Sequence, residues 1–373
     1  MITYKRIYNK NFISEKPLEA GIFSGLRDKE YFLTGNVRGG LLFLFDNLGI
    51  GKGDTILLPA FAPHGLILPA RKRGITINFY RLTKELTPDT LDLENRIQNS
   101  VSVKAVVVIQ YFGYYSDLCE ISLVSDKYGI LLLEDRAHMV FEPSNFKSSA
   151  DVIFYSLAKL LPVPDGALFI INSSELKIQA KQLKRNPANS LAVFFSKLEL
   201  NFRTLETKTY SKMLRSLYSS IGTILHAIYY FLICLPNSAS PISKETIKLL
   251  ERFNIHDAME RRRNMMFRIL SMNIMNNLPL AYRKYNGEAT PGIPVISNNS
   301  DQETSKLSKV GIKVLSYNKY WWFVPENQED DYKWERYIHD NHYLIPVNEN
   351  MTDKDADELE AQLKKIFDIE HSG

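Results

Sequence analysis

Short apolar runs alternate with amphipathic stretches through the first half of the chain. Six of the runs have the length and the content of branched apolar residues expected of buried strands, at 55–59, 75–80, 104–110, 130–134, 151–155 and 167–172. Between them the pattern predicts helices over 37–48, 66–72 and 91–97, and a further helix that is capped by Ser116 and runs to Tyr128. Nearly continuous apolar strands that alternate with helices are typical of a mostly parallel sheet covered on both faces. The sequence therefore predicts an α/β fold.

The pattern changes in the second half of the chain. From about 175 to 270 it predicts helices, and after about residue 290 short strand-like runs return, at 292–296, 311–315 and 321–324. A last helix is expected over 353–367, capped by Thr352 and buried through the apolar positions Ala356, Leu359, Leu363 and Ile366. A chain of 373 residues exceeds one ordinary domain. We expect a large α/β domain over 1–260, which includes the helical segment 175–260, and a smaller α+β C-terminal domain over 261–373.

One segment, 221–235, is continuously apolar apart from Thr223 and His226, and Pro236 ends it. It is too short to span a bilayer comfortably. We expect a buried helix or a helix at a subunit interface; contact with a membrane surface is the weaker alternative. If this helix lies at a subunit interface, the protein is a homodimer. Charges placed at Ile228 and Leu232 should then weaken the dimer or the fold.

Composition excludes several classes of protein. The net charge is only +4 and the charged residues are well mixed, so we expect no nucleic-acid partner, which would need a denser basic stripe. Two cysteines, Cys119 and Cys234, cannot build a disulfide scaffold, and the seven histidines lack metal-ligand spacing, so we expect no metal site. The N-terminus shows no apolar signal segment, and a cytoplasmic location is expected.

Polar residues with chemical potential follow three of the predicted strands. Gln110, Asp135 and Ser156 stand at the ends of their strands, and Lys159 comes three residues after Ser156. The carboxyl ends of parallel strands meet at one edge of a sheet, where ligands gather. A lone lysine there is usually a solvated residue and a lone aspartate a turn residue. Together they suit pyridoxal phosphate, which needs a lysine amine for a Schiff base and a carboxylate at the pyridine nitrogen.

A glycine-containing turn, TGNVRGG at 34–40, precedes the first predicted helix. The first turn of a helix offers unpaired N–H groups and the positive end of the helix dipole, so this segment is a phosphate site in outline. An ordinary turn before a core helix is the alternative, since the segment matches neither the Walker nor the dinucleotide pattern.

Several ordered motifs resemble the DegT/DnrJ/StrS family of sugar aminotransferases, which are fold-type I pyridoxal phosphate enzymes. The similarity is carried by LGIGKGD at 48–54, LPAF at 58–61, YFG at 111–113, EDRAH at 134–138, FYSLAK at 154–159 and LIPVNENMTD at 344–353. The resemblance implies a mostly parallel sheet flanked by helices, with a smaller α+β C-terminal domain.

The resemblance also implies roles for individual residues. Lys159 matches the Schiff-base lysine, and Asp135 matches the partner of the pyridine nitrogen. The other matching positions would bind the cofactor: His138 near the ring hydroxyl, Ser156 at the phosphate, and Arg38 and Gly39 where backbone amides hold the phosphate.

Two features depart from the family pattern. The aromatic residue that usually covers the cofactor ring falls in the stretch 61–64, so His64, or Phe61 if the loop shifts, would be the stacking group. The usual GxNxR motif, whose Asn reaches the neighbouring subunit's phosphate, has no clean copy, and 184–186 is a poor substitute.

The expected function is therefore transfer of an amino group from an amino acid, with glutamate the usual donor, to a keto sugar. We expect the sugar to be nucleotide-linked and the pathway to make cell-surface polysaccharide or a secondary metabolite. Lys159 would act as general base and acid. One alternative is a cofactor-dependent sugar dehydratase, but such enzymes are expected to carry histidine in place of the lysine. Another is a fold relative that binds a partner or regulates a pathway without turnover.

Overall fold

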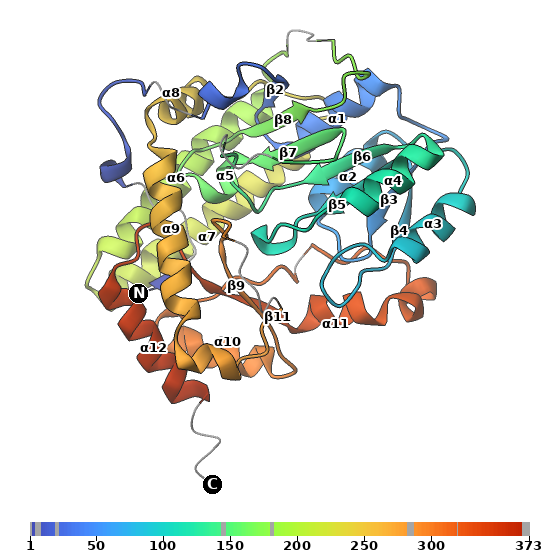
Figure 1. Ribbon diagram of the computed structural model, residues 1–373. Helices are drawn as coiled ribbons and strands as arrows, with labels where there is room; N and C mark the ends of the chain where they lie inside the picture. The colour runs from blue at the N-terminus through green and yellow to red at the C-terminus, as the bar shows by residue number, and fades with distance from the viewer. Residues whose placement is uncertain are drawn as a thin grey trace.

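The computed structural model describes residues 2–3, 9–18, 22–142, 147–179, 183–281, 287–318 and 320–367. Its centre is a sheet of seven strands in the order β2-β8-β7-β6-β5-β3-β4 (Figure 1). The strands are β2 Glu30–Thr34, β3 Thr55–Pro59, β4 Thr76–Tyr80, β5 Val103–Ile109, β6 Leu131–Asp135, β7 Val152–Ser156 and β8 Ala167–Ile171. Strands β3 to β7 run parallel, and β8 is antiparallel to both of its neighbours. The predicted α/β fold is confirmed.

Helices cover this sheet close to the predicted positions. They are α1 Val37–Leu48, α2 His64–Lys72, α3 Thr90–Gln98, α4 Cys119–Tyr128 and the short α5 Leu157–Leu160. Helix α1 packs tightly because Gly40 has no side chain: a Cβ there would lie 2.0 Å from the ring of Phe169. The expected cap at Ser116 was wrong. Helix α4 begins after Leu118, and the Ser116 N–H instead donates to the side chain of Gln110.

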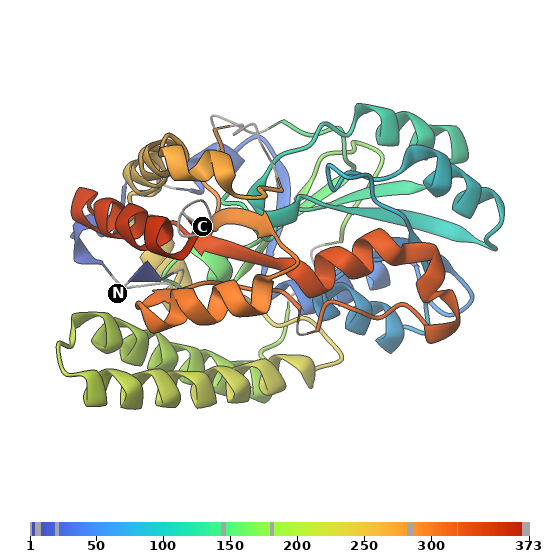
Figure 2. The same cartoon turned by 90° about the horizontal axis from the view of Figure 1, so that it is seen from below.

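The helical segment contains α6 Pro187–Lys208, α7 Lys212–Cys234, α8 Lys244–Arg252 and α9 Ile255–Leu270. Helices α6 and α7 lie side by side along one edge of the molecule (Figure 2). The apolar segment 221–235 falls mostly within α7. The sequence predicted either a buried helix or a helix at a subunit interface, and the structure shows that the helix is not buried within the chain. Only 22% of the most apolar window of α7 is buried, and by length and composition this helix could cross a membrane.

The C-terminal part is small and mixed, as expected. Strand β9 Gly292–Ile296 pairs antiparallel with β11 His342–Pro346, and β1 Ile2–Thr3 pairs with β10 Ile312–Lys313. Helices α10 Ser300–Lys309, α11 Lys333–Asn341 and α12 Asp353–Phe367 pack around them. The prediction of a strand at 321–324 is wrong. This segment is a loop, and one β-bridge joins its residue Trp322 to Phe61, which follows β3 of the large sheet. The predicted domain division at 260/261 falls inside α9 and stays a prediction.

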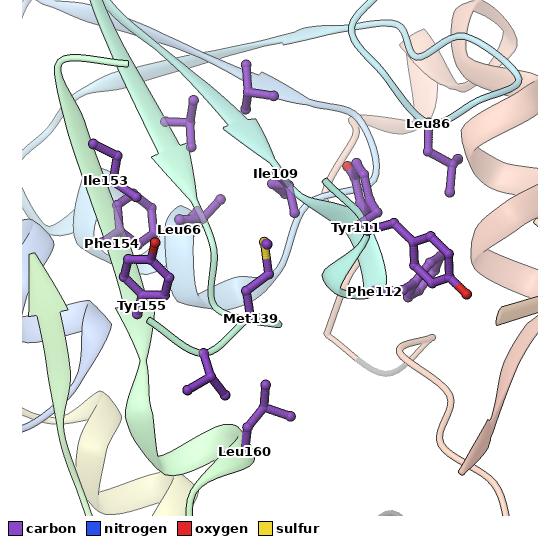
Figure 3. Close-up of a cluster of buried hydrophobic side chains, with 14 of the residues drawn as sticks. Leu66, Leu86, Ile109, Tyr111, Phe112, Met139, Ile153, Phe154, Tyr155 and Leu160 are labelled. Carbon is purple, nitrogen blue, oxygen red and sulfur yellow. The ribbon is translucent and has the colours of Figure 1, made fainter. Parts of the chain in front are cut away.

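The apolar core reaches the carboxyl ends of the central strands. Ile109 of β5, Phe154 of β7 and Leu160 of α5 belong to one buried cluster, which also includes Met139 (Figure 3). In α12, Ala356, Leu359 and Leu363 are buried as the pattern predicted, and Ile366, the fourth predicted position, is only partly buried. Polar groups at the strand ends are therefore packed against apolar side chains, where a charged group is poorly solvated.

Candidate active site

Neighbouring strands bring the two central candidate residues together. Asp135 ends β6, Ser156 ends β7, and Lys159 lies in α5, which follows β7 directly. In the sheet register Asp135 pairs with Ile109 on one side and Phe154 on the other. The sequence prediction that these residues share one edge of the sheet agrees with this geometry.

Burial and proximity change the acid–base chemistry of this pair. Desolvation raises the pKa of Asp135 to about 6, although the nearby Lys159 and the Ala137 N–H, 2.8 Å from Oδ1, act in the opposite direction. Desolvation also lowers the pKa of Lys159 to about 8; Asp135 opposes this shift and Arg38 adds to it. The Lys159 side chain keeps contact with solvent, but surrounding protein displaces enough water to shift its pKa. An amine that loses its proton near pH 8 is suited to nucleophilic attack and proton transfer.

His138 lies beside this pair and is held in one tautomer. The Phe112 N–H donates to His138 Nδ1 at 3.2 Å, so Nε2 carries the proton of the neutral ring. Burial, then the positive charge of Lys159, lowers the pKa of His138 well below its usual value. Nε2 is buried and has no hydrogen-bond partner among the residues that the structure describes. An unpaired buried donor is unfavourable by itself, so it marks a position for a ligand oxygen.

The turn that fixes His138 has little freedom. Phe112 adopts a left-handed backbone conformation with φ of 58°, and Gly113 follows with φ of 84°. A Cβ at Gly113 would lie 2.5 Å from the carbonyl oxygen of His138. Only glycine permits this close approach, so the YFG motif positions the histidine ring.

An aromatic wall from the C-terminal part closes one side of the site. Tyr317 stacks on His138 with ring centroids 4.6 Å apart, and Trp321 lies at 5.6 Å and 17° to the same ring. Lys159 Nζ is 6.0 Å from the centre of the Trp321 ring. Sequence reasoning missed Tyr317 and Trp321 as site residues, because it interpreted the aromatic cluster near 321 as a strand. The concentration of aromatic residues over 317–323 was the available signal.

A buried polar network supports the backbone on both sides of Asp135. Glu134 is fully buried and accepts hydrogen bonds from Gln110 Nε2 at 2.6 Å and from Ser148 Oγ at 2.6 Å. Arg136 Nε lies 2.9 Å from the same carboxylate, and Arg136 also donates to the Tyr155 hydroxyl. A buried charge pair with satisfied partners restrains its surroundings, so this network fixes the direction of the Asp135 side chain between its two members.

The proposed phosphate region lies at the start of α1. Asn36 caps this helix and accepts from the Gly39 N–H at 2.9 Å, so this amide already has a partner. The Arg38 guanidinium lies over the ring of Tyr230, 4.8 Å from its centre, and Nε of Arg38 is buried without a partner among the described residues. Asn36 was not singled out from the sequence. Ser156 stands at the end of β7 with a half-buried side chain.

His64 is placed in a second aromatic group. It begins α2, its Nδ1 is 3.0 Å from the Tyr230 hydroxyl, and its ring stacks on Phe323 at 5.6 Å. Burial, then the positive charge of Arg38, lowers its pKa. The other stacking candidate, Phe61, is fully buried and lies 4.9 Å from Trp321. The identity of the ring-stacking residue therefore stays a prediction. The segment 184–186, the poor match to GxNxR, ends in Asn186, which caps α6 by accepting from the Ala188 N–H.

Comparisons with known proteins give a family match over the first half of the chain. The model of the DegT/DnrJ/EryC1/StrS aminotransferase family matches residues 15–192. A curated relative, a pleiotropic regulatory protein of Geobacillus stearothermophilus, is 23% identical over 178 residues, which are 45% of this chain and 47% of the relative. The chain thus matches about half the length of that relative.

Solved structures share the whole fold at low sequence identity. A putative sugar aminotransferase of Streptococcus pneumoniae in its PMP-form gives a TM-score of 0.68 at 13% identity and covers 96% of this chain and 93% of its own. The Helicobacter pylori aminotransferase involved in pseudoaminic acid biosynthesis gives 0.63 at 14% identity, covering 98% and 99%. The Brucella abortus aminotransferase of the DegT group gives 0.63 at 15% identity, covering 96% and 92%. The resemblance of the sequence to the DegT/DnrJ/EryC1/StrS aminotransferase family is thus confirmed by the family match over residues 15–192, and the fold of the whole chain is that of these solved structures.

Proposed function

We propose that this chain is a pyridoxal 5′-phosphate-dependent aminotransferase that transfers an amino group from an amino acid to a keto sugar. One observation carries the proposal. A buried carboxylate, a lysine with lowered pKa and a histidine with an unpaired buried N–H stand together at the ends of adjacent strands. Perturbed pKa values of this kind concentrate at functional sites.

The residues present fit the cofactor. Lys159 offers the amine to which an aldehyde can attach, and Asp135 offers a carboxylate for a protonated ring nitrogen. His138 Nε2–H, unpaired among the described residues, suits the ring hydroxyl oxygen. Arg38, Ser156 and the first turn of α1 would hold the phosphate, with Asn36 giving up its bond to the Gly39 N–H.

Bound at this position, the cofactor would supply an electron sink for the carbon that exchanges its amino group. Lys159 would take a proton from that substrate carbon as general base and would donate it as general acid to the cofactor carbon that receives the amino group. Asp135 would stay ionised beside the ring nitrogen and keep it protonated. Tyr317 and Trp321 cover the site and would limit access of water.

The finer parts of the proposal concern substrate and assembly. We propose glutamate as donor and a nucleotide-linked keto sugar as acceptor, in the biosynthesis of a cell-surface polysaccharide or secondary metabolite in the cytoplasm. Support comes from the structural neighbours, one named a putative sugar aminotransferase and another assigned to pseudoaminic acid biosynthesis. We also propose a homodimer, because α7 carries an apolar face that this chain does not bury itself.

A regulatory role without turnover is the second candidate. It is favoured by one observation, that the curated relative is named a pleiotropic regulatory protein. Lys159 and Asp135 weigh against it, since a protein without turnover has no need of a buried acid opposite an amine. The dehydratase alternative is opposed by the lysine at position 159.

A spectrum and a substrate panel test the proposal. The purified protein mixed with pyridoxal phosphate should absorb in the visible near the violet edge, and glutamate should shift that band. Keto sugars linked to different nucleotides should then give amino sugars at the expense of glutamate. A protein that binds the cofactor but converts no sugar in a broad panel would favour the regulatory role. Absence of cofactor binding would reject the aminotransferase proposal.

A further inference from the structure

Two adjacent tryptophans in the loop that follows β10 have different surroundings. Trp321 is buried and borders the strand-end site: the Lys159 amine lies over its ring, 6.0 Å from the centre, and the ring centroid of His138 is 5.6 Å away. Trp322 makes its contacts elsewhere, and its Nε1 donates to Glu329 at 2.8 Å. Trp321 is therefore the member of the pair that a ligand at the strand ends would meet.

The backbone of this loop fixes the direction of Trp321. Tyr320, directly before the pair, adopts a left-handed conformation with φ of 69°, which residues other than glycine rarely adopt. Its carbonyl accepts from the His64 N–H at 2.8 Å, and the bridge between Phe61 and Trp322 holds the next part of the loop. Backbone strain of this kind persists only where surrounding contacts enforce it, and it is concentrated at ligand sites.

A buried histidine of β11 anchors the start of the same loop. His342 accepts from the Tyr317 N–H through Nε2 at 2.8 Å and donates from Nδ1 to the carbonyl of Ile338 at 2.8 Å. Both bonds need a neutral ring, and burial lowers the pKa of His342 to about 4. Tyr317 in turn stacks on His138 and lies 5.0 Å from Trp321, so the loop is held against the site from both ends.

The residues expected from the sequence to cover the cofactor ring have other neighbours. Phe61 is fully buried between Tyr111, which stacks on it at 5.5 Å and 7°, and Trp321 at 4.9 Å, so it supports the tryptophan. His64 contacts Tyr230 and Phe323 of the second aromatic group. In the part of the chain that the structure describes, Trp321 is the aromatic ring over which the Lys159 amine lies.

A flat cofactor ring that reaches both polar groups of the site would lie beside Trp321. Its aldehyde carbon would meet Lys159 Nζ, and its hydroxyl oxygen would meet the unpaired Nε2–H of His138. The planes of His138 and Trp321 are 17° apart, so both rings border the same space. An aromatic ligand gains from contact with a neighbouring ring, and a protonated pyridine nitrogen adds attraction to the indole face.

We infer that Trp321 supplies the aromatic surface against which the ring of pyridoxal phosphate is held. The inference rests on the proposed function and assigns it a binding residue, in the role that the sequence gave to the stretch 61–64. That residue comes from the loop between β10 and β11. The C-terminal part of the chain would therefore take part in binding the cofactor, with His342 as a residue that positions the loop.

Affinity for pyridoxal phosphate tests the inference, with the two neighbouring tryptophans as matched variants. Trp321→Ala should raise the apparent dissociation constant about tenfold in an absorbance titration, because one aromatic contact with the ring is lost. Trp321→Phe keeps an aromatic face and should bind within about threefold of the native protein. Trp322→Ala is the control and should leave the affinity unchanged. Circular dichroism checks that each variant is folded.

A second measurement is independent of affinity. Borohydride reduction of the native protein with cofactor leaves a fluorescent pyridoxyl amine on Lys159, and the same reaction is carried out on each variant. An indole in contact with this fluorophore quenches its emission by electron transfer, and a phenyl ring does not. Per mole of label, Trp321→Phe should therefore be brighter than the native adduct, and Trp322→Phe should equal it.

Three outcomes would overturn the inference. They are a folded Trp321→Ala variant that binds as tightly as the native protein, equal losses of affinity in Trp321→Ala and Trp322→Ala, and equal emission from the reduced adducts of the native protein and Trp321→Phe. Weaker binding in His64→Ala but not in Trp321→Ala would give the role to His64. If Trp321→Ala does not fold, the two phenylalanine variants decide.

Failure of the inference differs from failure of the proposed function. A native protein that binds no pyridoxal phosphate rejects the proposed function and the role of Trp321 with it. Cofactor bound at Lys159, with the variants at positions 321 and 322 behaving alike, rejects only the role of Trp321.

Discussion

The strand-end site and the exposed face of α7 break the usual rule of burial in opposite directions. At the strand ends, Asp135 and His138 are polar groups placed inside apolar surroundings, and each has a shifted pKa. On α7, Leu217, Ile224 and Phe231 are apolar groups placed in water. Neither arrangement stabilises the isolated chain. Both suggest interactions with something outside it, a ligand in the first region and a second protein chain in the second.

The strand-end site should respond most strongly to loss of its amine. Lys159→Ala should abolish the visible cofactor absorbance and lower turnover by about 10³-fold or more. The fold should persist, because Lys159 keeps solvent contact and leaves no apolar cavity. Borohydride reduction of the native protein with cofactor should label the peptide that contains Lys159. Label on another lysine would contradict the assignment, and Lys127→Ala, at an exposed ion pair with Glu94, is the control.

Asp135→Asn should separate cofactor binding from chemistry. The amide preserves shape but cannot hold the ring nitrogen protonated, so we expect bound cofactor and turnover reduced by roughly 10²-fold or more. The same change should stabilise the cofactor-free protein at neutral pH, because the burial that raises the pKa of Asp135 opposes its ionised form. Turnover near the native rate would remove Asp135 from the mechanism. Denaturant titration at pH 7.5 measures the stability effect.

The two faces of α7 should respond differently to charge. Leu232→Asp, on the packed face, should lower the free energy of unfolding by about 2–4 kcal/mol, because it buries a carboxylate in an apolar cluster. Leu217→Asp, on the exposed face, should leave intrachain packing intact and lower the mass of the proposed homodimer. Chemical denaturation and sedimentation of both variants measure the contrast. Equal losses of unfolding free energy would show that the two faces are not distinct.

The pH dependence of stability should reveal the lowered pKa of Lys159. Its pKa falls from 10.5 unfolded to about 8 folded, so between these values the unfolded chain binds more protons. This group therefore makes the cofactor-free protein more stable as pH rises from about 8 to 10.5. Lys159→Met should remove that component, which is seen by comparing melting temperatures of the two proteins across this range. Parallel curves for both proteins would show that Lys159 titrates normally.

The smallest expected effect joins the two regions. Tyr230→Phe removes the hydroxyl that bonds to His64 while keeping the ring beneath Arg38. Loss of one hydrogen bond of this kind is worth about 1 kcal/mol, so we expect cofactor affinity to fall about fivefold. Fluorescence or absorbance titration with pyridoxal phosphate measures it. A change within twofold would mean that α7 and the cofactor site are not coupled through Tyr230.

The sequence by itself determined much of the large domain and the centre of its site. Period and apolar content located the strands β3 to β8 within a residue or two, because a strand buried on both faces is nearly continuous in apolar residues. The shared position of Asp135 and Lys159 follows directly from these strand predictions, since residues at the ends of neighbouring parallel strands must meet at one edge of the sheet. The edge strand β2 was missed, because its first residues are exposed and it lacks such a run.

Only the tertiary structure decided what surrounds these residues and which way α7 faces. Tyr317 and Trp321 reach the site from more than 150 residues further along the chain, and no local pattern specifies such a contact. The capping of α1 by Asn36 depends on side-chain geometry that glycine spacing does not show. Helix α7 is apolar on almost every side over 221–235. Its sequence therefore does not show which of its faces packs on α6 and which faces outward. That choice was made by the buried charged residues of α6 and by Gly222, which bring one side of α7 against α6.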